Sequence, residues 1–298
     1  MAPTNIGIGH FGRGDQIFNG PVTGQSFGRD EERRSEERRR ADVGVLTVIE
    51  EEMVAVAEVL RSMHGYRTRR LDNDGPLVHE ARFPAGGDEI RLAAMQTLDR
   101  GPRTSGLAFE RLVRAYEPAV VLLVGIAGGV QPSVKVGDVV ISDQVIYYDA
   151  RREAADGPHR RGQAHTVTAA LGHRLNEFFL TAGREARTPE GTPFRMYRGP
   201  IGSGDAVITD VDSEIRRWLG TFHEKILAVE TEAAGVAQAF HERSTGKSPT
   251  YGWLTIRGIS DAADAAKGHR DHALASEHAA ATMRLLLPHL VFGPDSGA

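Results

Sequence analysis

The sequence predicts an α/β protein, a three-layer α/β/α sandwich with a central mixed, largely parallel sheet. Two observations lead to this fold class. From Val43 onward, short apolar runs alternate with segments of helical periodicity, which is typical of strands connected by helices. The apolar runs are nearly continuous and rich in Val, Ile and Leu, as in strands that helices cover on both faces.

The elements follow in order along the chain. VGVLTVI (43–49) has the continuous apolar pattern of a buried strand, and EEEMVAVAEVLRSM (50–63) follows as a helix with acids in its first turn. AVVLLVGIAGG (119–129) is an apolar strand that runs into a glycine turn. ILAVETEAAGVAQAF (226–240) begins as a strand and becomes helical from about Glu232. We expect further strands at 89–96, 136–149, 195–209 and 250–261, and further helices at 104–116, 166–183, 210–220 and 274–290.

Composition excludes several classes of protein. The chain has 298 residues, 40% of them hydrophobic, which is enough for a sizeable core. Its net charge of −4 gives no sign of nucleic-acid binding. Because it contains no cysteine, a disulfide scaffold and a Cys-based zinc site are excluded. We also expect neither a metal nor a cofactor. No apolar run approaches the roughly 20 residues that span a bilayer, and the N-terminus does not resemble a signal peptide. We therefore expect a cytoplasmic protein without a membrane partner.

Residues 1–40 differ from the rest of the chain. The first part is rich in glycine and contains the related stretches HFGRGDQ and SFGRDEE, and a block of charged residues follows up to Ala41. This composition is typical of a flexible arm. The repeated unit also fits an interaction segment that would contact a partner. We therefore divide the chain into an N-terminal arm, 1–40, and a globular domain, 41–298.

Acids and glycine turns gather where the predicted strands end, which is where α/β sheets bind ligands. Each has an ordinary explanation: acids favour a helix N-terminus, glycines permit tight turns, and Ser260 or Asp261 could cap the last helix. GIAGG lacks the spacing of a phosphate loop or a dinucleotide fingerprint. Together, however, they indicate a ligand site. The features are Glu50, Glu51 and Glu52, GIAGG (125–129), GSGDAVI (202–208), Glu230 and Glu232, and Ser260 and Asp261.

Five blocks in the same order resemble the nucleoside phosphorylase and nucleosidase superfamily, and most of all the methylthioadenosine/S-adenosylhomocysteine nucleosidases. They are VGVLTVIEEEM, VGIAGGVQPSVKVGDVVISD, SGDAVI, AVETEAAGVAQAF and IRGISDAAD. The resemblance covers residues 43 to 264 and not 1–40. It implies a phosphorylase/hydrolase-like fold, a catalytic domain at 41–298, and an enzyme that cleaves the N-glycosidic bond between ribose and a purine such as adenine.

The resemblance also implies roles for individual residues. Asp261 would be the general acid that protonates the purine at N7, which the chemistry requires because an adenine anion leaves poorly. Glu52 would activate the attacking water, Glu232 would bind the ribose 2′- and 3′-hydroxyls, and Ser260 would steady Asp261. For Glu230 we favour a structural role. The rest of the substrate pocket would be formed by Ala127, Gly128, Gly129, Val207, Ile208 and Thr231.

The chain departs from the family pattern at both ends of the expected substrate. Val207 stands where the family has an aromatic residue, so base stacking must come from elsewhere or be weaker. Thr231 stands where the family has methionine, which removes an apolar contact under the sugar. After ISDAAD, the basic residues Lys267, His269 and Arg270 suggest a 5′-phosphate, although they could equally form a solvated helix start.

Alternative functions remain open at this point. A phosphate-dependent phosphorylase needs a cationic cradle, which Arg100 or Arg103 could supply unless they face solvent, whereas an anionic Glu52 would repel phosphate. A catalytically inactive nucleoside sensor is a second alternative. The glycine-rich arm would suit a signalling or antiviral defence context. The resemblance further implies a homodimer or a higher homo-oligomer.

Overall fold

The computed structural model describes residues 40–243, 250–263 and 271–291, which belong to one compact unit. The predicted arm, apart from Arg40, lies outside the described residues, and so do Lys267, His269 and Arg270.

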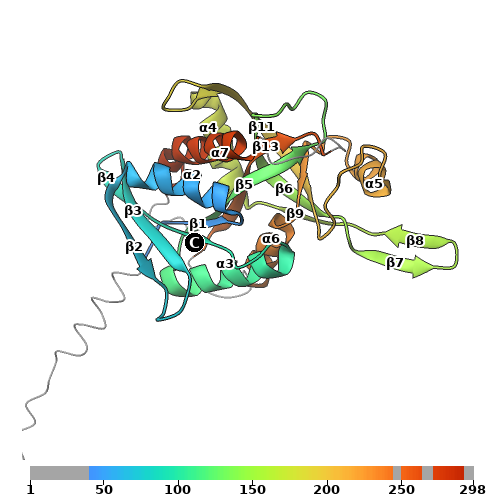
Figure 1. Cartoon of the computed structure of the whole chain (residues 1–298), viewed down its shortest axis with the longest axis horizontal. Helices are drawn as coiled ribbons and strands as arrows, with labels where there is room; N and C mark the ends of the chain where they lie inside the picture. Colours follow the sequence, from blue (N-terminus) through green and yellow to red (C-terminus); the bar gives the residue numbers. More distant parts are fainter. Residues whose placement is uncertain (1–39, 244–249, 264–270, 292–298) are drawn as a thin grey trace, which may run out of the picture. The chain divides into compact units, whose positions relative to one another are not determined.

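A mixed sheet organises this unit (Figure 1). At its centre the strand order is β11-β6-β13-β5-β1-β4, and most of these pairs are parallel, although β13 and β6 are antiparallel. The predicted mixed, largely parallel sheet is therefore confirmed. The central strands are β1 (Val43–Thr47), β4 (Asp88–Gln96), β5 (Val120–Gly129), β6 (Val139–Tyr147), β11 (Pro193–Ser203) and β13 (Gly252–Asp261).

A short strand closes part of the sheet on itself. β12 (Ala228–Glu230) pairs in parallel with β11 and antiparallel with β5. Together with the pairs β5–β13, β13–β6 and β6–β11, this makes a closed ring of five strands. The closure brings the end of β12 next to the end of β5, because Ala228 pairs with Gly129 and Val229 with Gly128.

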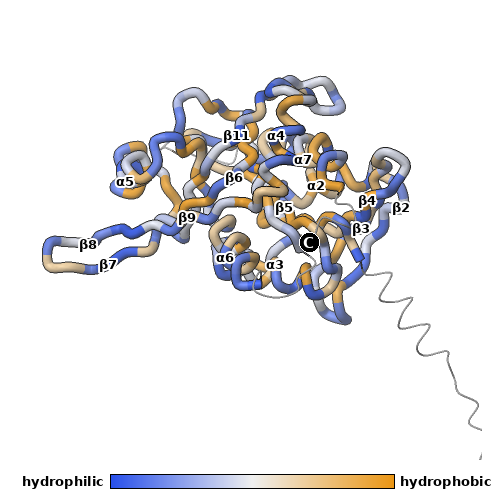
Figure 2. The backbone as a smooth tube through the Cα atoms, turned by 180° about the vertical axis from the view of Figure 1, so that it is seen from behind, coloured by the Kyte–Doolittle hydropathy of each residue, from blue (hydrophilic) through white to orange (hydrophobic). Residues whose placement is uncertain are grey.

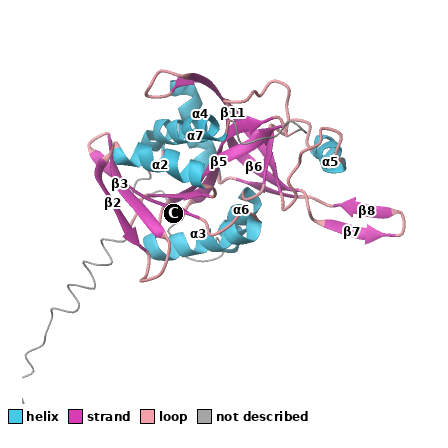
Figure 3. Cartoon of the chain, in the orientation of Figure 1, coloured by secondary structure: helices cyan, strands magenta, loops and turns pink. Residues whose placement is uncertain are grey.

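Helices cover both faces of the sheet, which confirms the three-layer sandwich (Figure 3). One face carries α2 (Glu50–Arg61), α4 (Ala169–Ala182) and α7 (His272–Leu286), and α2 packs against α7. The opposite face carries α3 (Pro102–Tyr116) and α6 (Ala233–Arg243), which pack against each other. A shorter helix, α5 (Glu214–Phe222), and the 3-10 turn η1 (Leu287–His289) complete the described helical segments.

The core lies between the central strands and these helices. Every residue of β1 and β13 is buried, as is nearly all of β5, which is the expected consequence of helices on both faces. Figure 2 shows hydrophobic residues concentrated on the central strands, whereas the hairpin of β7 (Arg151–Ala154) and β8 (Gly157–Arg160) is hydrophilic.

The structure adds strands that the sequence pattern did not predict. Most of these segments are exposed and charged, as in HGYRTRR, so they lack the apolar pattern on which the prediction depended. The additional strands are β2 (His64–Arg70), β3 (Leu77–Ala85), β7, β8, β9 (Gln163–Thr166) and β10 (Glu185–Arg187). β2 and β10 end the sheet on either side, β3 lies between β2 and β4, β9 pairs with β6, and β7 and β8 form a hairpin.

None of the helices in the described part of the chain is long and apolar enough to cross a membrane.

Candidate active site

A cavity of about 590 Å³ opens where several central strands end. The loops that follow β1, β4, β11 and β12 contribute to it, together with the last residues of β5 and β13. The strand ends that the sequence singled out therefore do meet in space. The lining consists of Val48, Ile49, Glu52, Arg100, Ile126, Ala127, Gly128, Tyr148, Ala206, Val207, Ile208, Thr209, Val229, Glu230, Thr231, Glu232, Ser260 and His272.

Glu52 lies in the first turn of α2 with only 3% of its surface exposed. Its Oε2 accepts hydrogen bonds from the backbone N–H groups of Val48 (2.6 Å) and Ile49 (3.1 Å), and its Oε1 accepts one from Ile126 (2.9 Å). Burial raises the pKa of the Glu52 carboxyl, although Arg257 and these hydrogen bonds act in the opposite direction. The carboxylate is thus fixed in place and made more basic than usual.

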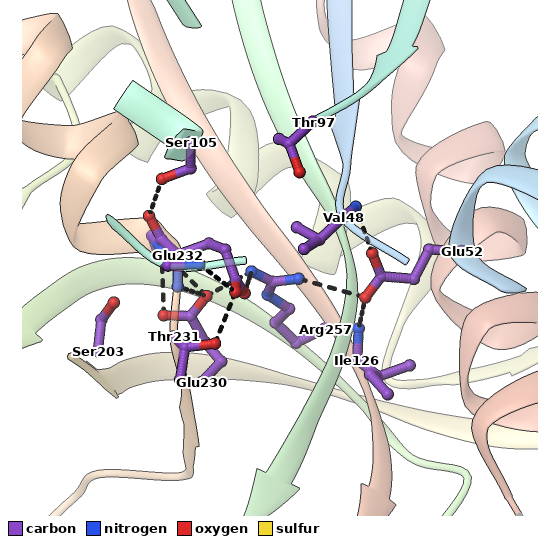
Figure 4. A network of polar contacts seen from close by, with 12 residues as sticks. Val48, Glu52, Thr97, Ser105, Ile126, Ser203, Glu230, Thr231, Glu232 and Arg257 are labelled. Atoms are coloured by element: carbon purple, nitrogen blue, oxygen red, sulfur yellow. Dashed lines mark hydrogen bonds and ion pairs between the residues drawn. The ribbon is translucent and has the colours of Figure 1, made fainter. Parts of the chain in front are cut away.

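Arg257 connects Glu52 with the other two carboxylates of the site (Figure 4). It lies on β13 and is completely buried. Its Nη2 forms an ion pair with Glu230 and another, at 3.2 Å, with Glu232, while Nη1 lies 3.7 Å from Glu52 Oε1. We did not predict this residue. The available signal was a single arginine inside the apolar strand GWLTIRGISD, where an unpaired charge would be costly.

Glu230 has the structural role that we favoured. Its carboxylate accepts hydrogen bonds from the backbone N–H groups of Glu232 (3.0 Å) and Ala233 (3.0 and 3.1 Å), where α6 begins. It therefore satisfies donors that the first turn of a helix leaves without partners. Burial raises the pKa of the Glu230 carboxyl, against the opposing effect of Arg257.

Hydrogen bonds to its carboxylate and to its backbone carbonyl orient Glu232. Its Oε1 accepts hydrogen bonds from Gly101 N–H (3.1 Å) and from the Thr231 hydroxyl (2.6 Å). Ser105 on α3 donates to the Glu232 carbonyl at 2.7 Å. Glu232 is 5% exposed and lines the cavity, so a bound molecule with neighbouring hydroxyls could donate to its carboxylate.

Ser260 and Asp261 lie at the end of β13. The Ser260 hydroxyl donates to Asp261 Oδ2 at 2.8 Å, and Ala263 N–H donates to Oδ1 at 2.8 Å. Ser260 lines the cavity, whereas Asp261, 7% exposed, is not part of the lining. The predicted contact between these two residues is therefore present, and it holds the carboxyl of Asp261 next to a residue of the cavity lining.

Two glycines of the GIAGG block lie so close to these carboxylates that a side chain would clash with them. A Cβ on Gly125 would lie 2.2 Å from Glu52 Oε1 and 2.3 Å from Arg257 Nη1. A Cβ on Gly128 would lie 2.9 Å from Asp261 Oδ1. Both distances of Gly125 are far below van der Waals contact, so the ion pair of Glu52 and Arg257 requires glycine at this position.

The loop after β11 forms an apolar wall. Ile208 is buried and Val207 is 57% exposed, and both line the cavity as expected. Asp149 holds the start of this loop, because its Oδ2 accepts hydrogen bonds from Asp205 N–H (2.5 Å) and Ala206 N–H (3.2 Å).

The structure brings together most, but not all, of the predicted site residues. Asp261 and Gly129 do not line the cavity but adjoin residues that do. Arg103 is exposed on the first turn of α3 and does not line the cavity; Arg100, just before the helix, does. Arg270 lies outside the described residues. The predicted residues that line the cavity are Glu52, Ala127, Gly128, Val207, Ile208, Thr231, Glu232 and Ser260. Among the residues that the structure describes, no group of His, Asp or Glu side chains could hold a metal ion.

The chain resembles known proteins in both sequence and structure. Residues 76–291 match the model of the Phosphorylase superfamily. A 5′-methylthioadenosine/S-adenosylhomocysteine nucleosidase of Mycobacterium bovis is 27% identical over 263 residues, which cover 82% of this chain and 95% of that protein. The ATP nucleosidase Cap17 of Escherichia coli is 25% identical over 244 residues, which cover 76% of this chain and 45% of that protein.

Solved structures share the fold. The futalosine hydrolase of Helicobacter pylori superposes with a TM-score of 0.65 at 19% identity, over 84% of this chain and 98% of that one. A 5′-methylthioadenosine/S-adenosylhomocysteine nucleosidase from Neisseria meningitidis, in complex with methylthio-immucillin-A, gives 0.62 at 22% identity, over 83% and 98%.

A mixed sheet with a carboxylate-lined cavity at its strand ends, together with these relatives, defines an enzyme of the nucleosidase type. The chain belongs to the phosphorylase superfamily.

Proposed function

We propose that this enzyme hydrolyses the N-glycosidic bond of an adenine nucleoside or nucleotide and releases the free base and a ribosyl product. The observation that carries the proposal is the presence of Glu52 and Glu232 in one cavity, together with Ser260, which lines the same cavity and donates a hydrogen bond to Asp261. The relatives, a 5′-methylthioadenosine/S-adenosylhomocysteine nucleosidase and an ATP nucleosidase, support adenine as the base and differ in what the 5′ carbon of the substrate carries.

The geometry supports a role for Glu52 as the base and for Asp261 as the acid of the proposed reaction. A water molecule beside Glu52 would attack C1′ of the ribose and give its proton to the Glu52 carboxylate, whose raised pKa makes it a better base. The bond from C1′ to N9 breaks, and its electron pair goes to the purine. Asp261 would supply a proton to N7, so that the base leaves as a neutral molecule.

Glu232 and Arg257 would support the ribosyl group during this step. Glu232 would accept hydrogen bonds from the two ribose hydroxyls, and nearby carboxylates stabilise the positive charge that develops on the ribose. Arg257 holds Glu52 and Glu232 together, and its Nη1 forms no hydrogen bond within the described structure. That N–H group lies next to Glu52, where the attacking water would bind.

Two alternatives give different outcomes in a simple assay. A phosphorylase would form ribose 1-phosphate in phosphate buffer, whereas a hydrolase forms free ribose or ribose phosphate with its phosphate on the 5′ carbon. A non-catalytic sensor would release no adenine. The hydrolase is favoured because three backbone N–H groups hold the Glu52 carboxylate in the cavity, where its ionised form would repel phosphate.

Replacing the acid tests the proposed mechanism. Asp261→Asn should lower kcat by a factor on the order of 10² or more and leave KM for the nucleoside largely unchanged, because the amide cannot donate the required proton. Adenine release is the measurement. The control is Asp156→Asn, which removes an exposed carboxylate from the turn of the β7–β8 hairpin. Equal kcat values for the two variants would remove Asp261 from the mechanism.

The enzyme is also proposed to act as a homo-oligomer, as expected from the sequence. Leu98 and Leu107, which are 96% and 73% exposed, support this proposal, because both lie on the segment that carries Arg100 and α3 beside the cavity.

A further inference from the structure

Thr231 is a cavity residue that has no part in the mechanism described above. It lies between β12 and α6 and is partly exposed, although Glu230 and Glu232 on either side of it are buried. Its hydroxyl donates a hydrogen bond to Glu232 Oε1 at 2.6 Å (Figure 4). Because Thr231 is partly exposed and belongs to the lining, its side chain borders the space that a substrate would occupy.

The carboxylate of Glu232 has few acceptor sites left for a substrate. An ionised carboxylate offers about four lone-pair sites on its two oxygens. Oε1 of Glu232 already accepts hydrogen bonds from Gly101 N–H and from Thr231, and Oε2 accepts one from Arg257 Nη2 at 3.2 Å. Counted over the described residues, these bonds leave about one site, on Oε2.

The 2′- and 3′-hydroxyls of a ribose are two donors, which is one more than Glu232 can accept while it keeps its present bonds. The bonds from Gly101 and Arg257 would be costly to give up. The first comes from the backbone N–H just before α3, and the second comes from a completely buried guanidinium. A second acceptor is therefore needed beside Glu232.

The Thr231 hydroxyl can be that acceptor. Its single hydrogen is used in the bond to Glu232, so both of its lone pairs remain, and no described residue donates to them. A hydroxyl that donates to a carboxylate is polarised by that bond, which makes its oxygen a better acceptor. The oxygen also lies 2.6 Å from the carboxylate, so neighbouring hydroxyls of one sugar can reach the two residues together.

We infer that Thr231 is a further substrate-binding residue, which accepts a hydrogen bond from one ribose hydroxyl while the other ribose hydroxyl donates to Glu232. The inference rests on the proposed function and refines it, because the two hydroxyls are divided between Thr231 and Glu232 and do not both bind Glu232. It also defines the sugar of the substrate: a ribose with both hydroxyls binds better than a 2′- or 3′-deoxyribose.

The test removes the hydroxyl from the enzyme and from the substrate in turn. The parent substrate is whichever of adenosine, adenosine 5′-monophosphate and 5′-methylthioadenosine releases adenine fastest, and it is compared with its 2′-deoxy and 3′-deoxy analogues. The unmodified full chain should prefer the parent to both analogues. In Thr231→Val, which keeps the shape of the side chain, the preference over at least one analogue should fall roughly two- to tenfold in kcat/KM.

Two further variants separate binding from support of Glu232. Thr231→Ser keeps the hydroxyl, so both preferences should equal those of the unmodified enzyme. Thr181→Val is the matched control, because Thr181 is exposed on α4, outside the cavity lining, and its hydroxyl donates to the Glu177 carbonyl at 2.9 Å. It should also leave both preferences unchanged.

The outcomes distinguish the inference from the proposed function. If Thr231→Val lowers kcat/KM equally for the parent and both analogues, Thr231 only positions Glu232 and the inference is overturned. An unmodified enzyme that cleaves both deoxy analogues as well as the parent would overturn it too. If none of the three parent candidates releases adenine, the proposed function itself fails, and the inference with it.

Discussion

At the residue scale, the site is a buried cluster of one arginine and three carboxylates. Burial acts to lower the pKa of the Arg257 guanidinium, but Glu230, Glu232 and Glu52 together keep it above its ordinary value. Removing one member of such a cluster is costly, because the partner charges stay buried without compensation. The cluster therefore fixes the carboxylates in place, and Glu52 and Glu230 acquire raised pKa values as a consequence of the same burial.

The raised pKa of Glu52 predicts a pH dependence. Glu52 must be ionised to accept a proton from water, so activity should be lost as the pH falls through its folded-state pKa. Because this pKa lies above the ordinary value of 4.5, the acidic limb of the kcat/KM profile should also lie above 4.5. The measurement is kcat/KM for adenine release across the acidic range.

Glu52→Gln is the companion variant. It should lower kcat by a factor on the order of 10² or more, and the residual activity should no longer show this limb. An acidic limb at or below 4.5 in the unmodified enzyme would contradict the assignment of Glu52 as the base.

At the scale of elements, the second half of β5 shows how glycines let a strand pass close to functional side chains. Gly125 lies opposite Glu52 and Arg257, with no space for a Cβ, whereas the Cβ of a residue at position 129 would meet its nearest neighbour, Ile259 Cγ2, at 3.2 Å. These two glycines of the GIAGG motif thus differ in how much space the structure leaves for a side chain.

This difference predicts unequal effects of the same substitution. Gly125→Ala should displace Glu52 and Arg257, which should lower kcat by about tenfold or more and destabilise the fold by about 1–3 kcal/mol through overpacking. Gly129→Ala should have smaller effects on both. Adenine release and thermal unfolding of the two variants provide the measurements. If Gly125→Ala were as active as Gly129→Ala, the close approach would have no functional role.

At the scale of the whole molecule, the sheet topology gathers residues that are far apart in the sequence. Glu52, Arg100 and Glu232 follow three different strands, and Ser260 lies at the end of a fourth. The ring closed by β12 places the end of β12 beside the end of β5. Beside the cavity, Leu98 and Leu107 expose large apolar surfaces. Such surfaces are often buried when copies of a chain assemble.

Assembly can be tested by placing charges on the exposed leucines beside the cavity. The unmodified protein should be a dimer or a larger oligomer by light scattering at micromolar concentration, and Leu98→Asp/Leu107→Asp should shift it toward the monomer, because a charge in an apolar interface is unfavourable. Leu180→Asp is the control, since Leu180 is equally exposed, at 86%, but lies on α4 on the other face of the sheet. A monomeric unmodified protein would contradict the proposal.

Much of the fold could be predicted because buried strands and helices have a recognisable pattern of apolar residues in the sequence. The strands β1, β5 and β13 are continuous apolar runs, and their helices carry periodic apolar residues, so both were expected at nearly the observed positions. The edge strand β2 and the β7–β8 hairpin could not be found in this way. They are held by pairing with a neighbouring strand and bury little, so their residues are free to be charged.

The site was predicted in part for a similar reason. Glu52 and Glu232 are recognisable because a carboxylate at the end of an apolar strand requires an explanation. Arg257 was missed because its charge is compensated only by residues from α2 and from the end of β12, far away in the sequence. The sequence did not show which of Arg100 and Arg103 faces the cavity. Because α3 begins at Pro102, Arg103 is exposed on the first turn of the helix, whereas Arg100 precedes the helix and lines the cavity.

By itself, the sequence determined the three-layer class, the order of the main elements and the strand ends that carry acids, because these depend on hydrophobic periodicity and on short motifs. Only the tertiary structure decided which charges compensate one another. Ion pairing depends on distances of a few ångströms between segments that the chain separates by up to about two hundred residues, as between Glu52 and Arg257. The partner of each carboxylate, the role of Glu230 and the place of Arg100 in the cavity lining are therefore properties of the packed molecule.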